Sequence, residues 1–212
     1  MADISATQVK DLREATGAGM MDCKKALVEA GGDIHRAKEL LREWGIARSD
    51  KRAGREAREG VVCSYIHHSS KVGVLLELNC ETDFVARTEA FRRLANDLAM
   101  HIAAAAPFYV SSDQVDQATL ERERRLCRQQ ALNEGKPEKV VDRIVEGRMQ
   151  TFFKEACLLR QPFVKDDSKD VESVIKEAGG TIGERISVAR FVRFQVGEKP
   201  SSDGQNAPPS LS

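Results

Sequence analysis

The chain has 212 residues, and its 33 lysines and arginines are balanced by 33 aspartates and glutamates, so its formal net charge is zero. Binding to nucleic-acid phosphates draws most of its affinity from a surplus of basic residues, so this balance argues against nucleic acid as a direct ligand. The composition, 41% hydrophobic and 31% charged, is ordinary for a soluble globular protein. No apolar stretch reaches the roughly 18 residues that a membrane span needs, and no membrane partner is expected.

The N-terminal residues and the cysteines indicate a reducing compartment. Residues 1–5 show neither a secretory nor a transit pattern, so a cytoplasmic location is expected. The five cysteines are odd in number and widely spaced, without a C-x-x-C pair, which favours free thiols over disulfides or a zinc site. They are Cys23, Cys63, Cys80, Cys127 and Cys157. No cofactor and no bound metal are expected.

Residues 1–47 are expected to form a bundle of three short helices. A capping-box pattern opens the first helix, which should stop near Gly17 because glycine tolerates the left-handed conformation there. The second helix is predicted over about 22–30, after a glycine-rich loop that holds Met20 and Met21, and a third follows. The two methionines either pack the bundle or adapt to the surface of a partner.

A change of periodicity separates this bundle from the rest. Residues 48–59 are charged without a large apolar side chain, and are predicted as a linker, although a solvated helix or a docking strip fits too. At Gly60 the apolar period changes from 3.6 to 2, so 61–80 is predicted as a β-hairpin. A long helix should begin at Thr88 and end before Pro107.

Helical segments dominate the second half of the chain. Residues 113–156 are predicted as a helical hairpin, with a glycine and a proline at its turn, 135–137. A loop over 160–164 should lead to a short helix at about 171–178. The Gly-Gly pair at 179–180 is expected to end that helix.

The predicted fold class is α+β. An alternating pattern over 186–196 predicts a closing strand, and 198–212 is predicted to be a disordered tail because it is rich in proline, serine and glycine. The chain should therefore contain an N-terminal three-helix bundle, and then a small antiparallel sheet packed with helices and a helical hairpin. These last parts are expected to form one core domain over 60–197.

Residue patterns offer little enzyme chemistry. A P-loop is absent from the sequence, and Gly17-Ala18-Gly19 lacks the third glycine and the preceding strand of a dinucleotide fingerprint. A thiol enzyme could be built from Cys80, Asp83 and His101, but sequence does not place them within hydrogen-bond reach. His101 lies at the edge of an apolar helical stripe, and is either a core-edge histidine or a functional residue.

The segment Thr82-Asp83-Phe84-Val85 lies where a predicted strand turns into a helix. Adjacent side chains within a strand point to opposite faces, but at such a junction both the acid and the aromatic can project outward. Phe84 is therefore either a staple that joins the helix to the core or a wedge for another protein.

Four strings resemble the elongation factor Ts family. They are LREATGAGMMDCKKAL at 12–27, NCETDFVAR at 79–87, EGRM at 146–149 and QPFV at 161–164. Together they are long, stand in the family's order and extend the resemblance over about 3–196. The resemblance implies a guanine-nucleotide exchange factor of elongation factor Tu, which promotes GDP release without covalent chemistry.

The resemblance also implies roles for single residues. In the family the N-terminal bundle is ubiquitin-associated-like and docks on the nucleotide domain of elongation factor Tu, and Leu12, Met20 and Met21 match the contact positions. The segment from Thr82 to Val85 matches the piece that intrudes near the partner's magnesium and phosphate site. His101 resembles a second intruding residue.

The chain departs from the longer form of the family, which has a duplicated core and an additional helical protrusion. Short members resemble this arrangement, which implies a homodimer in which a second copy completes the core. The competing hypotheses are an adaptor without exchange activity and the thiol enzyme described above.

Overall fold

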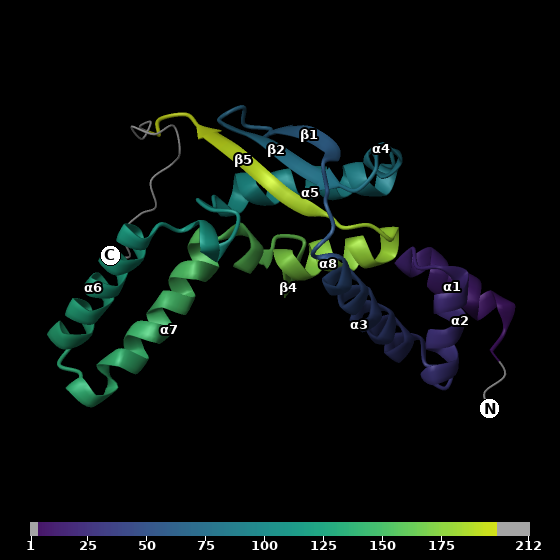
Figure 1. Ribbon diagram of the computed structural model, residues 1–212, viewed down its shortest axis with the longest axis horizontal. Helices are drawn as coiled ribbons and strands as arrows, with labels where there is room; N and C mark the ends of the chain where they lie inside the picture. Colours follow the sequence, from purple (N-terminus) through teal and green to yellow (C-terminus); the bar gives the residue numbers. More distant parts are fainter. Residues whose placement is uncertain (1–3, 199–212) are drawn as a thin grey trace. The chain divides into compact units, whose positions relative to one another are not determined.

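The computed structural model describes residues 4–198, which form two compact units (Figure 1). The first unit contains residues 4–60, Asn79–Phe91 and Ser173–Ser187. The second unit contains Val61–Leu78, Arg92–Glu172 and the described residues from Val188 to Glu198. All but the first residue of the predicted tail, 198–212, lies outside the described residues.

The first unit begins with the predicted three-helix bundle, which consists of α1 (Ala6–Thr16), α2 (Met20–Glu29) and α3 (Ile34–Arg52). Its core contains nine buried residues: Val9, Leu12, Ala18, Cys23, Ala26, Leu27, Ala37, Leu40 and Leu41. One prediction is wrong in detail, because Met20 and Met21 open α2 and do not lie in the loop. Gly17 ends α1 with a φ of 69° and Gly19 caps α2, so the loop is only three residues long.

Helix α3 extends into the segment predicted as a linker. Its last turns carry Arg48, whose guanidinium is 2.6 Å from Asp22 of α2, and Asp50, which is 2.8 Å from Lys176. These ion pairs bring the charged side chains onto neighbouring helices, so the helical alternative is correct for residues 48–52.

The prediction that Gly179-Gly180 ends a helix is wrong, because α8 (Val171–Ile182) runs through both glycines. The pair instead allows α8 to approach α3. A Cβ atom on Gly180 would lie 2.3 Å from the carbonyl oxygen of Gly45, a distance that no side chain tolerates. The helix ends at Gly183, whose φ of 92° favours glycine.

A three-stranded antiparallel sheet has the order β1-β2-β5, with β1 (Glu59–Ile66), β2 (Val72–Cys80) and β5 (Ser187–Gln195). Alternate residues of β2, among them Val74, Leu76 and Leu78, are buried on its inner face. Helix α5 (Glu89–Ala105) lies beside the sheet, where Arg193 of β5 donates to the carbonyl of Ala103 (Figure 1). The predicted hairpin, long helix and closing strand are thus confirmed.

The helical hairpin is also present, as α6 (Gln117–Asn133) and α7 (Glu138–Ala156) (Figure 1). Helix α6 begins four residues later than predicted. Asp116 accepts a hydrogen bond of 2.9 Å from the backbone N–H of Thr119 and so caps the helix, whereas Ser112–Gln114 forms a separate 3₁₀ turn.

A small second sheet was not predicted. β3 (Pro162–Phe163) pairs with β4 (Asp166–Asp170) in antiparallel register, so part of the predicted loop over 160–164 is a strand. The sequence of β4, Asp-Asp-Ser-Lys-Asp, has no apolar residue, and period-2 reasoning therefore cannot detect it. The overall class is α+β, as predicted. None of the described helices is long and apolar enough to cross a membrane.

Candidate functional site

The first candidate feature is the turn that follows β2, residues 82–85. Thr82 has extended backbone angles, and its hydroxyl accepts a hydrogen bond of 3.4 Å from the N–H of Val85, so it is the N-cap of the one-turn helix α4 (Asp83–Ala86). The predicted strand-to-helix junction is therefore confirmed. The side chain of Ala86 is buried, so this side of the α4 turn faces the interior.

Phe84 is exposed over 79% of its surface, which excludes the alternative that it staples the helix to the core. An aromatic side chain this exposed leaves apolar surface in water, and such surface commonly marks a contact for another protein. Asp83 is also on the surface, where its carboxylate is 2.8 Å from the guanidinium of Arg87 one turn later.

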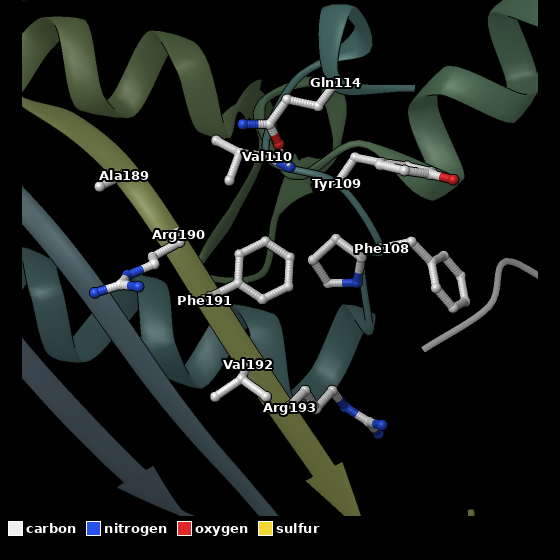
Figure 2. A pocket seen from close by; sticks show the side chains of 10 residues that line it. Phe108, Tyr109, Val110, Gln114, Ala189, Arg190, Phe191, Val192 and Arg193 are labelled. Carbon is white, nitrogen blue, oxygen red and sulfur yellow. Dashed lines mark hydrogen bonds between the residues drawn. The ribbon is translucent and has the colours of Figure 1, made fainter. Parts of the chain in front are cut away.

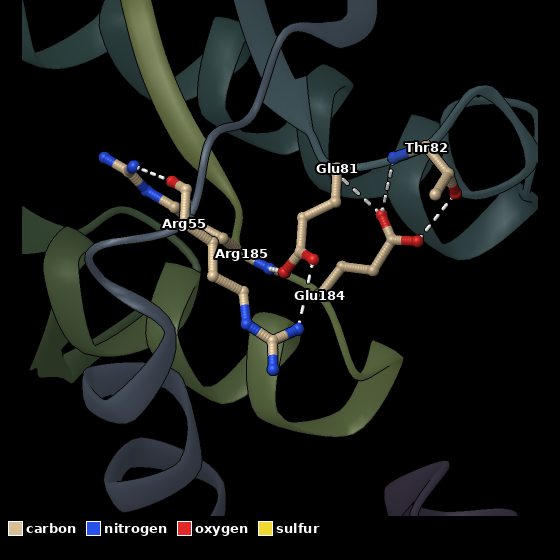
Figure 3. A network of polar contacts seen from close by, with 5 residues as sticks. All are labelled: Arg55, Glu81, Thr82, Glu184 and Arg185. Carbon is tan, nitrogen blue, oxygen red and sulfur yellow. Dashed lines mark hydrogen bonds and ion pairs between the residues drawn. The ribbon is translucent and has the colours of Figure 1, made fainter.

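A network of hydrogen bonds and ion pairs within the first unit anchors the start of the 82–85 turn (Figure 3). The carboxylate of Glu184 accepts hydrogen bonds from the backbone N–H groups of Glu81 and Thr82, at 3.0 and 3.1 Å, and from the Thr82 hydroxyl, at 2.6 Å. In return, the carboxylate of Glu81 accepts from the N–H of Arg185 at 2.7 Å and from Arg55 at 3.1 Å. These donors, the Arg185 N–H first, lower the pKa of Glu81.

The bundle of the first unit carries the second feature, a pair of exposed methionines. Met20 is 47% and Met21 75% exposed, so neither packs the bundle core. Met20 also lines a surface hollow of about 390 Å³ together with Lys10, Arg13, Glu14 and Gly17. Leu12, the third predicted docking residue, is 1% exposed and belongs to the core beneath this surface.

His101 lies in the second unit and is completely buried. Its Nδ1 accepts a hydrogen bond of 3.2 Å from the backbone N–H of Val164, and its Nε2 is 2.9 Å from Oε1 of Gln161. Its ring stacks on Phe163 with the centroids 5.8 Å apart. Burial disfavours the charged imidazolium and lowers the pKa of His101.

The cysteines do not have the environment of a nucleophile. All five are free thiols, and burial raises the pKa of Cys80, which donates to the carbonyl of Thr82 at 3.1 Å. Burial raises the pKa of Cys157 to about 11. Because the thiolate is the reactive form, a raised pKa weakens the thiol-enzyme hypothesis.

A hollow of about 410 Å³ lies in the second unit between β5 and the loop that follows α5 (Figure 2). Its rim combines aromatic side chains, such as Tyr109 and Phe191, with the guanidinium groups of Arg190 and Arg193. Arg190 pairs with Glu77 at 2.7 Å, and Arg193 pairs with Glu198 at 2.7 Å. Among the described residues that line it there is no carboxylate, histidine or thiol, and the Tyr109 hydroxyl is its one titratable group besides the two guanidiniums.

Sequence reasoning missed the residues that support these features. Glu184 and Arg185 act on Glu81 and Thr82 from more than 100 positions away, and Gln161 is 60 positions from His101. No local pattern marks such partners. The string Gln161-Pro162-Phe163-Val164 is a signal at one of these positions, because it resembles the elongation factor Ts family, but the string alone gives Gln161 no role.

Comparison with known proteins identifies the family. The family model described as Elongation factor TS matches residues 36–198. The chain is 59% identical over 198 residues to elongation factor Ts of Desulforamulus reducens, covering 93% of this chain and 91% of the relative. The chain belongs to the elongation factor Ts family.

Other members of the family are similar over the same length. Elongation factor Ts of Acetivibrio thermocellus is 55% identical over 195 residues, which cover 92% of this chain and 91% of that protein. For Thermosipho melanesiensis the identity is also 55% over 195 residues, with 92% of this chain and 100% of the relative covered. The match to the elongation factor Ts model includes the 82–85 turn and His101. It also contains the three strings of the core that carry the resemblance, at 79–87, 146–149 and 161–164.

Proposed function

We propose that this chain is a guanine-nucleotide exchange factor that binds elongation factor Tu in its GDP-bound state and releases GDP without covalent chemistry. One observation carries the proposal: an exposed phenylalanine, Phe84, stands on a short turn that is held by a network of charged hydrogen bonds. An apolar side chain that is exposed, on a turn that hydrogen bonds hold in place, is suited to insert into another protein.

The mechanism follows from how GDP is held. A bound guanine nucleotide is retained largely by Mg²⁺ and by backbone amides around its phosphates. An exchange factor therefore does not have to touch the nucleotide, because stabilising a partner conformation in which those ligands are displaced is enough. In our proposal Phe84 is the wedge, and Asp83 competes for donors that otherwise face the magnesium or the phosphate. To bind these donors, Asp83 gives up its ion pair with Arg87.

The N-terminal bundle, proposed to be a ubiquitin-associated-like domain, docks on the nucleotide domain of elongation factor Tu. Met20 and Met21 supply flexible apolar contact, and the hollow beside Met20 receives a side chain of the partner. Leu12 contributes from the core by fixing the position of α1 under this surface. Because coupling is reciprocal, GTP with Mg²⁺ must weaken the complex in turn.

His101 contributes to the interaction through the turn that it holds. Its hydrogen bond to Val164 and its stacking on Phe163 fix the β3–β4 turn, in which Val164 is 50% exposed. We propose that the partner contact at this position is made by Val164 and its neighbours and not by the imidazole.

A homodimer through the second unit is part of the proposal. Several apolar side chains are exposed on β1, β2 and β5: Val62 at 72%, Ile66 at 66%, Leu75 at 47% and Phe194 at 68%. Val62, Leu75 and Val192 line one shallow hollow on this face. A monomer rarely leaves so much apolar surface in water, so a second copy is proposed to cover it. Light scattering should give twice the chain mass, and Val62→Asp should reduce it to the chain mass.

Release of a fluorescent GDP analogue from purified elongation factor Tu, with and without this chain, tests the exchange function. We expect a strong acceleration that saturates as the concentration of the chain is raised. Unchanged release at a saturating concentration of the chain would refute the exchange function. Binding of elongation factor Tu without any acceleration would instead support an adaptor.

A further inference from the structure

The 82–85 turn is too short to hold its own conformation. Helix α4 has four residues, and a single turn fixes many backbone angles for one or two hydrogen bonds, so it needs external support. Phe84, with 79% of its surface exposed, contributes little packing to its own segment. The position of the phenyl ring therefore depends on the residues that anchor Thr82.

Glu184 is the main anchor. Its two carboxylate oxygens accept three hydrogen bonds from Glu81 and Thr82, the shortest of them 2.6 Å from the Thr82 hydroxyl (Figure 3). Hydrogen bonds to an ionised acceptor are about twice as strong as neutral ones. Thr82 is thereby fixed at its N–H and at its hydroxyl.

The hydrogen bonds between the 81–82 segment and the 184–185 segment run in both directions. While Glu184 holds the segment before Phe84, the carboxylate of Glu81 in that segment accepts from the N–H of Arg185 at 2.7 Å. Arg55 donates to Glu81, and Arg185 donates to the carbonyl of Arg55 (Figure 3). Three stretches of chain thus meet at one point of the first unit, so a movement of any one is resisted by the other two.

Glu184 lies two residues after the end of α8, and α8 packs on α3, the third helix of the bundle. The glycines at 45 and 180 bring the two helices into backbone contact, and Asp50 pairs with Lys176 at 2.8 Å beside it. The path from the methionines to Phe84 therefore runs through α3, α8 and Glu184, all within the first unit.

We propose that Glu184 is a positioning residue for Phe84, fixing the wedge relative to the methionine surface of the bundle. This inference rests on the proposed exchange function. When a partner docks on Met20 and Met21, the phenyl ring of Phe84 is already in the position from which it inserts into the partner. Without Glu184, ordering of the turn is a cost of the exchange step itself.

The test compares Glu184→Ala and Glu184→Gln with wild type in the release assay, over a full range of chain concentrations. We expect Glu184→Ala to lower the maximal release rate about tenfold and to change the half-saturating concentration less than about twofold, because docking is intact. Glu184→Gln keeps the shape and an acceptor oxygen, so it should retain activity within about threefold. Glu56→Ala is the control, since Glu56 is exposed and pairs with Arg58.

A double-mutant cycle with Phe84→Ala separates positioning from general stability. If Glu184 acts through Phe84, Glu184→Ala should cost less than about twofold once the phenyl ring is gone. If the two losses multiply, the proposal is overturned. Should Glu184→Ala not fold, Glu184→Asp takes its place in the cycle, because it keeps the charge but cannot reach all three donors.

The exchange function and the positioning role of Glu184 are refuted by different results. If wild-type chain does not accelerate release, the exchange function is wrong. If wild type is active and Glu184→Ala equals it in maximal rate, only the positioning role is wrong. Gly180→Ala, which forces α8 away from α3, should reduce activity, whereas Gly147→Ala should not, because a Cβ on Gly147 meets nothing within 4 Å. Full activity of Gly180→Ala would refute the path through α8.

Discussion

Phe84 and His101 present opposite arrangements of polar and apolar groups. Phe84 is an apolar side chain in water, and the groups that hold its turn are carboxylates and backbone N–H groups. His101 is a polar ring in the interior, packed against Phe163, and its exposed neighbour Val164 is apolar. In both regions an apolar residue is displayed and a polar group secures it.

The residue that is exposed to a partner and the residue that secures it are therefore different in the His101 region. A partner can contact Phe84 directly, whereas it meets His101 only through the turn that His101 supports. Substitution should therefore affect function first at Phe84 and stability first at His101.

The largest effect is expected at His101. His101→Ala leaves the N–H of Val164 without its buried acceptor and opens a cavity, so it should lower the free energy of unfolding by about 3 kcal/mol. Denaturant unfolding measures this loss. His68→Ala, at the exposed tip of the β1–β2 hairpin, is the control and should change the stability by less than about 0.5 kcal/mol. An equally stable His101→Ala would remove the distinction between the two regions.

Phe84→Ala should do the opposite. Because the ring is exposed, the free energy of unfolding should stay within about 0.5 kcal/mol of wild type. The maximal rate of nucleotide release should fall about 30-fold, equivalent to about 2 kcal/mol, as for a hot-spot aromatic side chain. Stopped-flow release and denaturant unfolding on the same sample measure both. A loss of stability without a loss of rate would contradict the wedge.

Acidification should affect the His101 region next. Since burial holds its pKa below 6.5, the unfolded chain binds more protons than the folded chain at pH values between the folded pKa and 6.5. Stability should therefore fall as the pH falls through this window and then level off. Between pH 7.5 and pH 5.5 the loss due to His101 is at most about 1.4 kcal/mol. Unfolding curves of His101→Gln should show a smaller loss, and equal losses would contradict the assignment.

The smallest effect is expected at the methionine surface. Met21→Ala removes flexible apolar contact from the docking surface, so it should raise the half-saturating concentration in the release assay about fivefold, or about 1 kcal/mol. The maximal rate should stay unchanged, because the wedge still enters. Val28→Ala, at another exposed apolar position of α2, is the matched control. A change of maximal rate in Met21→Ala would mean that docking and wedging are not separate.

Sequence predicted features that depend on local chemistry. The strand-to-helix junction at Thr82 was predictable because threonine is an N-cap, and the α5 stripe because its period is helical. The prediction for Gly180 is wrong because a glycine pair usually ends a helix, whereas here it allows contact with Gly45, 135 positions earlier in the chain. The burial of His101 and the anchoring by Glu184 depend on partners brought by the tertiary fold, and local patterns do not contain them.

The first unit has a practical consequence for building chimeras and fragments. It is assembled from three stretches that are far apart along the chain, and Asn79–Phe91 and Ser173–Ser187 belong to it as much as the bundle does. A contiguous fragment that ends after α3 would lack α8, the helix that packs against Gly45 of α3. A graft of the bundle from another family member must therefore bring its own α8 and its own turn, or the transplanted surface and the phenyl ring will no longer match in spacing.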